Sequence, residues 1–201
     1  MSTSTLIKTN SGITQVSLEA KFFSKRCINI NGEITDELAV DFTDKILELN
    51  LESNDPITVL INSPGGEINS GLLMYDAIVG SIAPVRMICR GKAYSMGAVL
   101  LACAGKRYML PNSELMLHQP MLGGRVSGNA SSIKSISDSM LETKKKINSL
   151  LAKHTGKTEE EIDKATDFDH YFSPDEAIVF NLCDEIIEFS KVIDFVKEAE
   201  W

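Results

Sequence analysis

The pattern of apolar and polar positions along this chain predicts strands and helices that follow one another in turn. Residues 26–32 (RCINING) alternate apolar and polar side chains and end in glycine, which is typical of a short strand. Residues 57–61 (ITVLI) are a continuous, β-branched apolar run, and residues 85–89 (VRMIC) predict a second buried strand. Residues 36–50 have apolar side chains at helical spacing, and residues 68–82 predict another helix.

The same succession returns further along the chain. Residues 90–95 (RGKAYS) predict a tight loop, and residues 96–105 (MGAVLLACAG) predict a helix of small residues. Residues 107–110 (RYML) and 114–118 (ELMLH) predict two strands around a Pro-Asn-Ser turn. A strand, loop and helix used twice indicate an α/β fold with largely parallel strands. Active sites of such folds usually lie at the carboxyl ends of the strands.

The two remaining regions differ in pattern. The first 20 residues are polar and weakly patterned, which predicts a mobile arm. Residues 129–154 form the longest helical pattern, whose single narrow apolar stripe favours packing against another subunit as well as the core. The stripe consists of Ile133, Ile136, Met140, Ile147, Leu150 and Leu151.

Capping boxes at 158–161 and 173–176 start two more helices. Since no linker or low-complexity segment divides the chain, we expect residues 1–201 to form a single domain.

Composition excludes several classes of protein. The chain is 43% apolar and 24% charged, as in an ordinary globular protein. Its net charge of -8 argues against nucleic acid and anionic membranes as main partners. No apolar run approaches the roughly 20 residues of a membrane span, and the first residues lack the features of a signal or transit peptide, so we expect a cytoplasmic protein. The four cysteines form no CxxC motif, which predicts buried free thiols rather than a zinc site.

Two segments suggest an oxyanion-binding site. In residues 63–66 (SPGG), two glycines follow a buried strand, and glycine lets the backbone approach a ligand closely. Ser95 and Met96 open a predicted helix, whose first N–H groups have no partner within the helix. The N–H groups of Gly66 and Met96 would together stabilise the negative charge that develops during acyl transfer at Ser95.

A serine hydroxyl becomes a nucleophile only with the help of a base. His118, at the end of a predicted strand, is the candidate base, and Asp169 in TDFDHYFS is the candidate carboxylate, expected to be buried, that would orient it. The order Ser, His, Asp differs from that of the α/β-hydrolases, and their GxSxG motif is absent from the sequence. From spacing alone, a helix N-cap at Ser95 and an ordinary hydrogen-bonded His118 remain the commoner interpretation.

Longer motifs change this balance. INSPGGEINSGLLMYDAI, GKAYSMGAVLLACAGKRYMLPNSELMLHQP, LLAKHTGKTEEEID and FSPDEAIVFNLCDEII together resemble the proteolytic subunit of the ATP-dependent Clp protease, from about Arg26 to Ile187. The resemblance implies a ClpP/crotonase-like spiral of ββα units with a protruding long helix. It further implies two stacked seven-membered rings, with residues 129–154 between the rings and residues 1–20 as an axial segment. A Clp-family AAA+ ATPase would dock outside and thread unfolded protein inward.

The resemblance also assigns roles to residues. It implies Ser95 as the nucleophile, His118 as the general base and Asp169 as the residue that orients it. Gly66 and Met96 would supply the N–H groups of the oxyanion hole. His154 and His170 match no catalytic position, and we expect both to be solvated.

Unfolded polypeptides, cleaved to short peptides, are the implied substrates. An extended substrate could add as a strand along residues 123–128 (GGRVSG), which makes Gly65, Gly123, Gly124 and Arg125 the candidate substrate-binding residues. Residues 156–158 (GKT) do not belong to a P-loop, because Leu151 stands where its first glycine should be. We therefore expect no nucleotide, metal or other cofactor on this chain, with ATP used by the partner ATPase alone.

Three features depart from the family pattern. Tyr94 precedes the serine where a small residue is usual, and Phe168 replaces an arginine that bridges the rings in the family. Residues 11–23 have little similarity to the usual sequence of the family. These changes fit a diverged second copy that works in a mixed assembly with another proteolytic subunit. On this hypothesis Ser95 is competent but needs a partner ring or ATPase to align it.

Two alternatives stay open at this point. One is a structural ring component whose own triad is idle. The other is a crotonase-like enzyme, which shares the fold and a glycine-made oxyanion hole but acts on acyl-CoA and would not require Ser95, His118 and Asp169 together. A serine-lysine membrane peptidase is disfavoured by the presence of His118 and the lack of a membrane segment.

Overall fold

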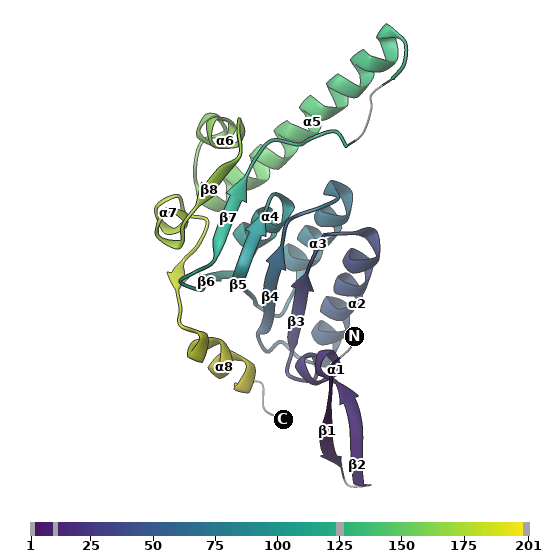
Figure 1. Cartoon of the computed structure of the whole chain (residues 1–201), viewed down its shortest axis with the longest axis vertical. Helices are drawn as coiled ribbons and strands as arrows, with labels where there is room; N and C mark the ends of the chain where they lie inside the picture. The colour runs from purple at the N-terminus through teal and green to yellow at the C-terminus, as the bar shows by residue number, and fades with distance from the viewer. Residues whose placement is uncertain (1–2, 10–11, 124–126, 199–201) are drawn as a thin grey trace.

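A seven-stranded sheet with helices on both faces forms the centre of the molecule (Figure 1). The computed structural model describes residues 3–9, 12–123 and 127–198. The strands of this sheet are β3 (Cys27–Asn31), β4 (Ile57–Ser63), β5 (Val85–Tyr94), β6 (Lys106–Met109), β7 (Glu114–Leu117), β8 (His170–Phe172) and β9 (Glu185–Ile186). The helices are α1 (Leu18–Phe23), α2 (Asp36–Glu52), α3 (Ile68–Gly80), α4 (Met96–Cys103), α5 (Ala130–Thr155), α6 (Glu159–Thr166), α7 (Pro174–Val179) and α8 (Phe189–Lys197).

The strands of the central path are parallel, in the order β3-β4-β5-β6-β9. Strand β7 pairs in parallel with the second half of β5, and β8 pairs with β7 in the antiparallel direction. Parallel strands joined by helical crossovers are what the repeated strand-loop-helix pattern predicts, and the α/β fold class is confirmed.

The segment predicted as a tight loop at residues 90–95 is instead largely strand. Strand β5 pairs with β6 through Cys89 and then, from Lys92 to Tyr94, with β7. The prediction was wrong because the apolar run ends at Cys89 but the strand does not. From Lys92 on, β5 is continued by hydrogen bonds to a new partner, β7, which the local sequence does not reveal. The longer β5 carries the chain directly to Ser95.

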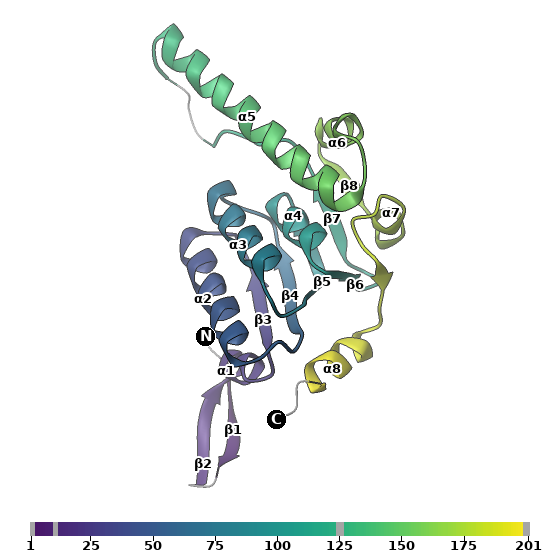
Figure 2. The ribbon, with the colours of Figure 1, turned by 180° about the vertical axis from the view of Figure 1, so that it is seen from behind.

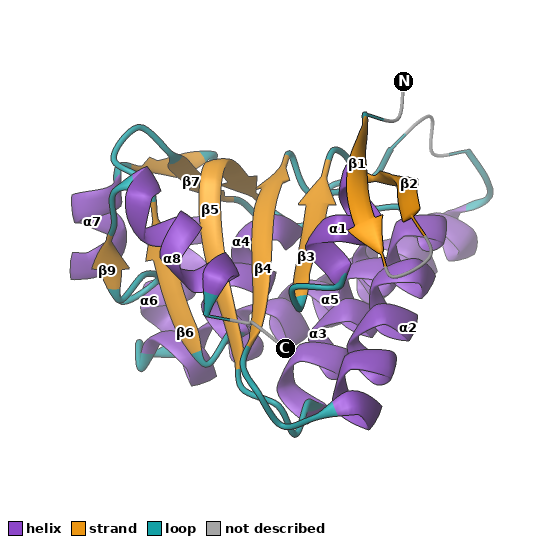
Figure 3. Ribbon diagram, turned by 90° about the horizontal axis from the view of Figure 1, so that it is seen from below, coloured by secondary structure: helices purple, strands orange, loops and turns teal. Residues whose placement is uncertain are grey.

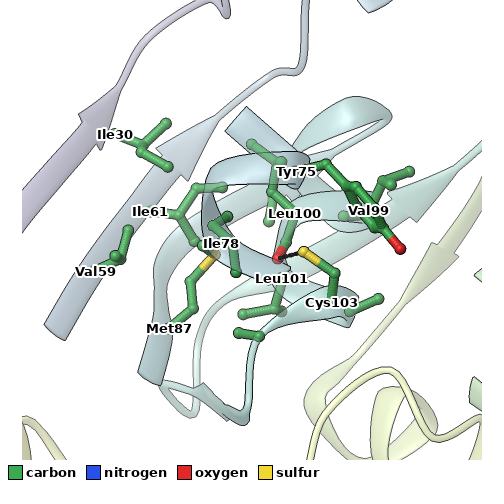
Figure 4. Packing of buried hydrophobic residues seen from close by; sticks show 14 of the residues in the cluster. Ile30, Val59, Ile61, Tyr75, Ile78, Met87, Val99, Leu100, Leu101 and Cys103 are labelled. Atoms are coloured by element: carbon green, nitrogen blue, oxygen red, sulfur yellow. Dashed lines mark hydrogen bonds between the residues drawn. The ribbon is translucent and has the colours of Figure 1, made fainter. Parts of the chain in front are cut away.

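The main core lies between the sheet and the helices α2, α3 and α4 (Figures 1 and 4). In Figure 4, Ile61 and Met87 of the strands face Leu100 and Leu101 of α4, and all four side chains are fully buried. Every residue of α4 is buried, so the helix is apolar on all sides rather than amphipathic. Burying a side chain of this size stabilises the fold by about 1.5–3 kcal/mol.

A second, smaller cluster covers the opposite face of the sheet, where α1 and α8 lie (Figures 2 and 3). Val192 and Phe195 of α8 pack on Leu60 and Ile88 of the strands. The guanidinium of Arg86 lies 4.2 Å from the centre of the Phe195 ring and adds a cation–π contact. Helix α8 was not among the elements predicted from the sequence.

The long helix predicted at residues 129–154 is confirmed as α5 (Figure 2). Asn129 caps its start and Gly156, with φ +70°, ends it. Only the C-terminal half packs on the core: Ile147 and Leu151 are buried, whereas Ile133 near the other end is 47% exposed. The predicted apolar stripe therefore leaves its N-terminal part uncovered in the single chain.

The N-terminal region is more regular than its sequence pattern predicts. Strands β1 (Ser4–Thr9) and β2 (Gly12–Ser17) pair in an antiparallel hairpin that extends away from the sheet (Figure 1). Its residues are mostly exposed on both faces, so no apolar alternation marks them as strands. The sequence analysis did not predict these two strands, and the mobility of the arm stays a prediction.

Within the described residues, no helix combines the length and the apolar character that crossing a bilayer demands.

Candidate active site

Ser95 lies at the turn between the end of β5 and the start of α4. Its backbone has φ +53° and ψ -121°, a conformation that costs a non-glycine residue about 1–3 kcal/mol and persists only where the surroundings impose it. The surroundings are its own N–H, which donates to Met116 O at 2.8 Å, and its carbonyl, which accepts from Ala98 N at 3.0 Å. Among the described backbone N–H groups, none donates to the Ser95 hydroxyl as a helix cap. The N-cap interpretation of the side chain is therefore wrong.

The hydroxyl of Ser95 is directed at His118 instead. His118 Nε2 lies 2.8 Å from Ser95 Oγ, and His118 Nδ1 lies 3.3 Å from Asp169 Oδ1. The imidazole is 11% exposed, whereas the Asp169 side chain is 57% exposed. The structure thus brings the three predicted residues together, but the expectation of a buried carboxylate is wrong for the single chain.

The sheet explains why three distant segments converge. Tyr94, just before Ser95, pairs with Met116 in parallel. Leu117, just before His118, pairs with His170, just after Asp169, in the antiparallel direction. The three residues therefore stand at the ends of three adjacent strands, β5, β7 and β8, whose order can be followed in Figure 1.

The two glycines of the SPGG segment lie directly against this turn. A Cβ built on Gly65 would lie 2.8 Å from Ser95 Cβ and 3.3 Å from Met96 N, so the backbones are too close for any other residue. A Cβ on Gly66 would lie 2.2 Å from the carbonyl oxygen of Ile34. Neighbouring bonds, from Ile34 N to Gly65 O and from Glu67 N to Ile34 O, hold the segment in place.

Two backbone N–H groups at the site remain available to a ligand. Among the described residues, no group accepts a hydrogen bond from the N–H of Gly66, and Met96 N–H is at the first position of α4, where no carbonyl of the helix can accept it. Both are the donors predicted from the sequence.

An apolar pocket opens beside the serine and histidine. It is lined by Ile68, Ser95, Met96, Val99, Leu117, His118, Pro120, Ile147 and Leu151. The helices α3, α4 and α5 each contribute side chains, so the pocket belongs to the same packing that buries the core.

A model of the Clp protease family matches residues 10–190 of the chain. The chain belongs to the Clp protease family. Members of the Clp protease family are peptidases, and this chain is a proteolytic subunit of that type. The match covers all seven strands of the central sheet, the glycine segment and the start of α4, and it is consistent with the α/β fold.

Other candidate residues of this Clp protease family member lie elsewhere. Gly123 is exposed, and a Cβ built on it would meet nothing within 4 Å. Gly124 and Arg125 lie outside the described residues.

His154 is half-buried, and one of its ring nitrogens lies 2.8 Å from the hydroxyl of Tyr75. Burial, and then the charges of Lys153 and Arg107, lower the pKa of His154 below its usual value.

The expectation that both spare histidines are solvated therefore holds for only one. The prediction is wrong for His154, because the end of α5 packs against α3 and half-buries its ring. His170 is exposed, and its ring stacks on that of Phe172 with 4.1 Å between the ring centres. Among the described residues, no group of three or more His, Cys, Asp or Glu side chains is arranged to hold a metal ion.

One cluster at the site was missed by the sequence prediction. Tyr94 donates a hydrogen bond to Glu114 and packs edge-on against Tyr171, with ring centres 5.8 Å apart. The unusual residue before the serine was noticed from the motif, but its two contacts are made across strands, so no local signal reveals them.

Proposed function

We propose that this member of the Clp protease family is a serine endopeptidase that cleaves unfolded polypeptides to short peptides through Ser95, His118 and Asp169. The observation that carries the proposal is the distance of 2.8 Å between Ser95 Oγ and His118 Nε2, at a helix start where the hydroxyl caps no described N–H group. A serine hydroxyl that caps no helix and lies within hydrogen-bond distance of an imidazole has the geometry of an activated nucleophile.

The chemistry follows from the atoms that face one another. Ser95 Oγ attacks the peptide carbonyl carbon while its proton passes to His118 Nε2. Asp169 accepts the Nδ1–H of the imidazole, which keeps Nε2 free to take the proton and stabilises the imidazolium. The proton then passes to the leaving amine, and water, activated by the same His118, releases the acyl group from Ser95.

The negative oxygen of the tetrahedral intermediate requires fixed donors. We assign this role to the N–H groups of Gly66 and Met96, and removal of one such donor typically costs about 100- to 1000-fold in kcat. The apolar pocket beside Ser95 would receive the side chain next to the scissile bond. The extended substrate would pair along residues 123–128, with Gly65, Gly123, Gly124 and Arg125 against its main chain.

Assembly into two stacked seven-membered rings is part of this proposal. The uncovered part of α5 and the segment before it support such a contact, because Leu141, Met121 and Leu122 are 62%, 72% and 47% exposed. An AAA+ ATPase would supply unfolded protein and use the ATP, and this chain itself would need no cofactor. We place this activity in the cytoplasm.

Two forms of this assembly stay open, a homo-oligomer of this chain and a mixed assembly with a second proteolytic subunit. Phe168 is 82% exposed and cannot form the ion pair of the arginine that the family has there. Within one chain, His118 lies 2.8 Å from Ser95 Oγ and 3.3 Å from Asp169 Oδ1, which supports a site built by a single subunit. The partner ring would then hold the exposed Asp169 in place rather than create the site.

Labelling with a fluorophosphonate probe and hydrolysis of a fluorogenic peptide test the proposal. Wild-type protein, alone and with its sister subunit and ATPase, is compared with Ser95→Ala and His118→Ala, and with the exposed Ser24→Ala as the matched serine control. We expect label and hydrolysis in wild type and Ser24→Ala, and loss of both in Ser95→Ala. An unlabelled Ser95 in the full assembly would support an idle structural subunit, and acyl-CoA turnover that survives Ser95→Ala would support the crotonase-like alternative.

A further inference from the structure

Tyr94 links the strand that carries Ser95 to the strand that follows Asp169. Its ring packs edge-on against the ring of Tyr171, with centres 5.8 Å apart and planes at 89°. Its hydroxyl donates to the Glu114 carboxylate on β7, which lies between the other two strands. Edge-to-face aromatic pairs are attractive beyond their buried area, so the contact favours one relative position of β5 and β8.

The register of the sheet sets these side chains in one row. Tyr94 pairs with Met116, and Met116 pairs with Tyr171, so the three side chains lie side by side across β5, β7 and β8. Ser95, His118 and Asp169 extend from the same three strands, each within two residues of this row. A shift of β8 would therefore move Tyr171 and Asp169 together.

Asp169 is the least firmly held member of the triad. Its side chain is 57% exposed, and its contact with His118 is 3.3 Å long. Two contacts flank it along the chain: Gln119 Nε2 donates to the backbone carbonyl of Asp167 at 3.0 Å, and the ring of Tyr171 meets that of Tyr94. Asp169 directly precedes β8 and is two residues from Tyr171, so the position of Tyr171 constrains that of Asp169.

We propose that Tyr94 is a positioning residue, whose contact with Tyr171 holds Asp169 within reach of His118. This inference rests on the proposed serine peptidase function. Tyr94 is not among the residues that line the apolar pocket beside Ser95. We therefore expect its substitution to act on the alignment of the triad, which the ratio of kcat to KM effects measures.

The hydrogen bond of the Tyr94 hydroxyl helps to hold its ring against that of Tyr171. The hydrogen bond to Glu114, and then burial, raise the pKa of Tyr94 to about 12, so the phenol remains neutral and keeps donating near neutral pH. The ammonium of Lys92 lies 5.6 Å from the centre of the same ring. The ring is thus held from two sides while its edge contact with Tyr171 remains.

Steady-state kinetics on the assembled full-length protein tests the inference. We expect Tyr94→Ala and Tyr171→Ala each to lower kcat by roughly 10-fold with KM changed less than about 2-fold, because an interaction used only in the transition state is weakened. Tyr94→Phe keeps the ring and should retain at least about half of the wild-type kcat. His170→Ala, on the other side of β8, is the matched control and should leave kcat unchanged.

Coupling between the variants separates positioning from a merely structural role. The double variant Tyr94→Ala/Tyr171→Ala should lose no more kcat than either single variant, and Tyr94→Ala should have little further effect in an Asp169→Asn background. Three results would each overturn the inference. They are a loss of kcat in the double variant equal to the product of the two single losses, an unchanged kcat in Tyr94→Ala, and a kcat of Tyr94→Phe as low as that of Tyr94→Ala. If Tyr94→Ala does not fold by circular dichroism, the half-exposed Tyr171→Ala carries the same test.

Ser95→Ala distinguishes this inference from the function on which it rests. Peptide hydrolysis that survives Ser95→Ala would overturn the proposed function and the inference with it. Hydrolysis that depends on Ser95 but is insensitive to Tyr94→Ala would overturn the positioning role alone.

Discussion

The Cβ position of Gly65 lies 2.8 Å from Cβ of Ser95, closer than two such carbon atoms approach in real proteins. Gly65 also has φ +90°, which side chains other than hydrogen rarely allow. The strained turn at Ser95 and the glycine segment therefore depend on each other. Neither can move without displacing the hydroxyl or the N–H groups beside it.

Substitution of Gly65 by alanine should abolish peptide hydrolysis. The methyl group would push Ser95 and the N–H of Met96 away from their positions, and a misplacement of about 1 Å costs roughly 100-fold in rate. We expect kcat to fall at least about 100-fold and the free energy of unfolding to fall by about 1–3 kcal/mol. Hydrolysis assays and urea unfolding measure the two effects.

Gly80 at the end of α3 is the matched control for this prediction. A Cβ there would meet nothing within 4 Å. Gly80→Ala should leave kcat unchanged and change stability by less than about 1 kcal/mol. Wild-type activity in Gly65→Ala would contradict the close packing of the glycine segment against the serine turn.

The buried Arg107 should make stability depend on the charge of Asp184. The Arg107 side chain donates to Asp184 Oδ1 from Nε at 3.0 Å and to the Asn181 carbonyl at 2.7 Å. Burial tends to raise the pKa of Asp184, but hydrogen bonds from Arg107 and its charge outweigh burial and leave the pKa below the ordinary 3.8. Asp184→Asn should lower the free energy of unfolding by roughly 3 kcal/mol at pH 7, because it leaves a buried guanidinium unpaired.

The pH dependence of this loss has a definite sign. A carboxyl whose folded pKa is lowered contributes its full stability above its ordinary pKa of 3.8 and loses it as the pH falls through the folded value. The difference in the free energy of unfolding between wild type and Asp184→Asn, measured by urea unfolding, should therefore become smaller from pH 7 to pH 3. The exposed Asp194→Asn serves as control, and a difference that stays constant over this range would contradict the ion pair.

The four cysteines should resist thiol reagents in the native protein. All four are buried as free thiols, and burial raises the pKa of Cys27 and Cys103 to about 12 and that of Cys183 to about 11. The thiolate is the reactive form, so neither access nor ionisation favours reaction near pH 8. Titration with an aromatic disulfide reagent should find no fast thiol in the native protein and four in guanidinium chloride.

A charge on the uncovered part of α5 should weaken assembly. Leu141 is 62% exposed, so Leu141→Lys should leave the fold of the single chain intact but place an ammonium in the proposed contact between rings. Native mass spectrometry should show smaller particles, and peptide hydrolysis should fall with them. The neighbouring exposed Glu142→Gln makes the same change in net charge, and an equal effect of both variants would argue against an apolar contact at Leu141.

Patterns within the sequence predicted most elements of the fold. The helical spacing at 36–50 and 129–154 corresponds to α2 and α5, and both capping boxes form, with Thr158 and Ser173 accepting from the N–H groups three residues on. These signals are local, since each depends on residues within a few turns. The hairpin at β1 and β2 was missed because it is mostly exposed. Helix α8 was missed although Phe189, Val192, Ile193 and Val196 have the spacing of an amphipathic helix.

The sequence by itself determined which residue types are available: a serine at a helix start, glycines after a buried strand, and a histidine at a strand end. Only the tertiary structure decided that they meet, because hydrogen bonds between strands far apart in the chain set the order β5-β7-β8. The change of partner along β5 brings Ser95 beside His118, and the antiparallel β8 returns Asp169 to it. The same register decided that Asp169 is exposed and that Tyr94 meets Tyr171, because strand pairing and burial depend on the whole sheet.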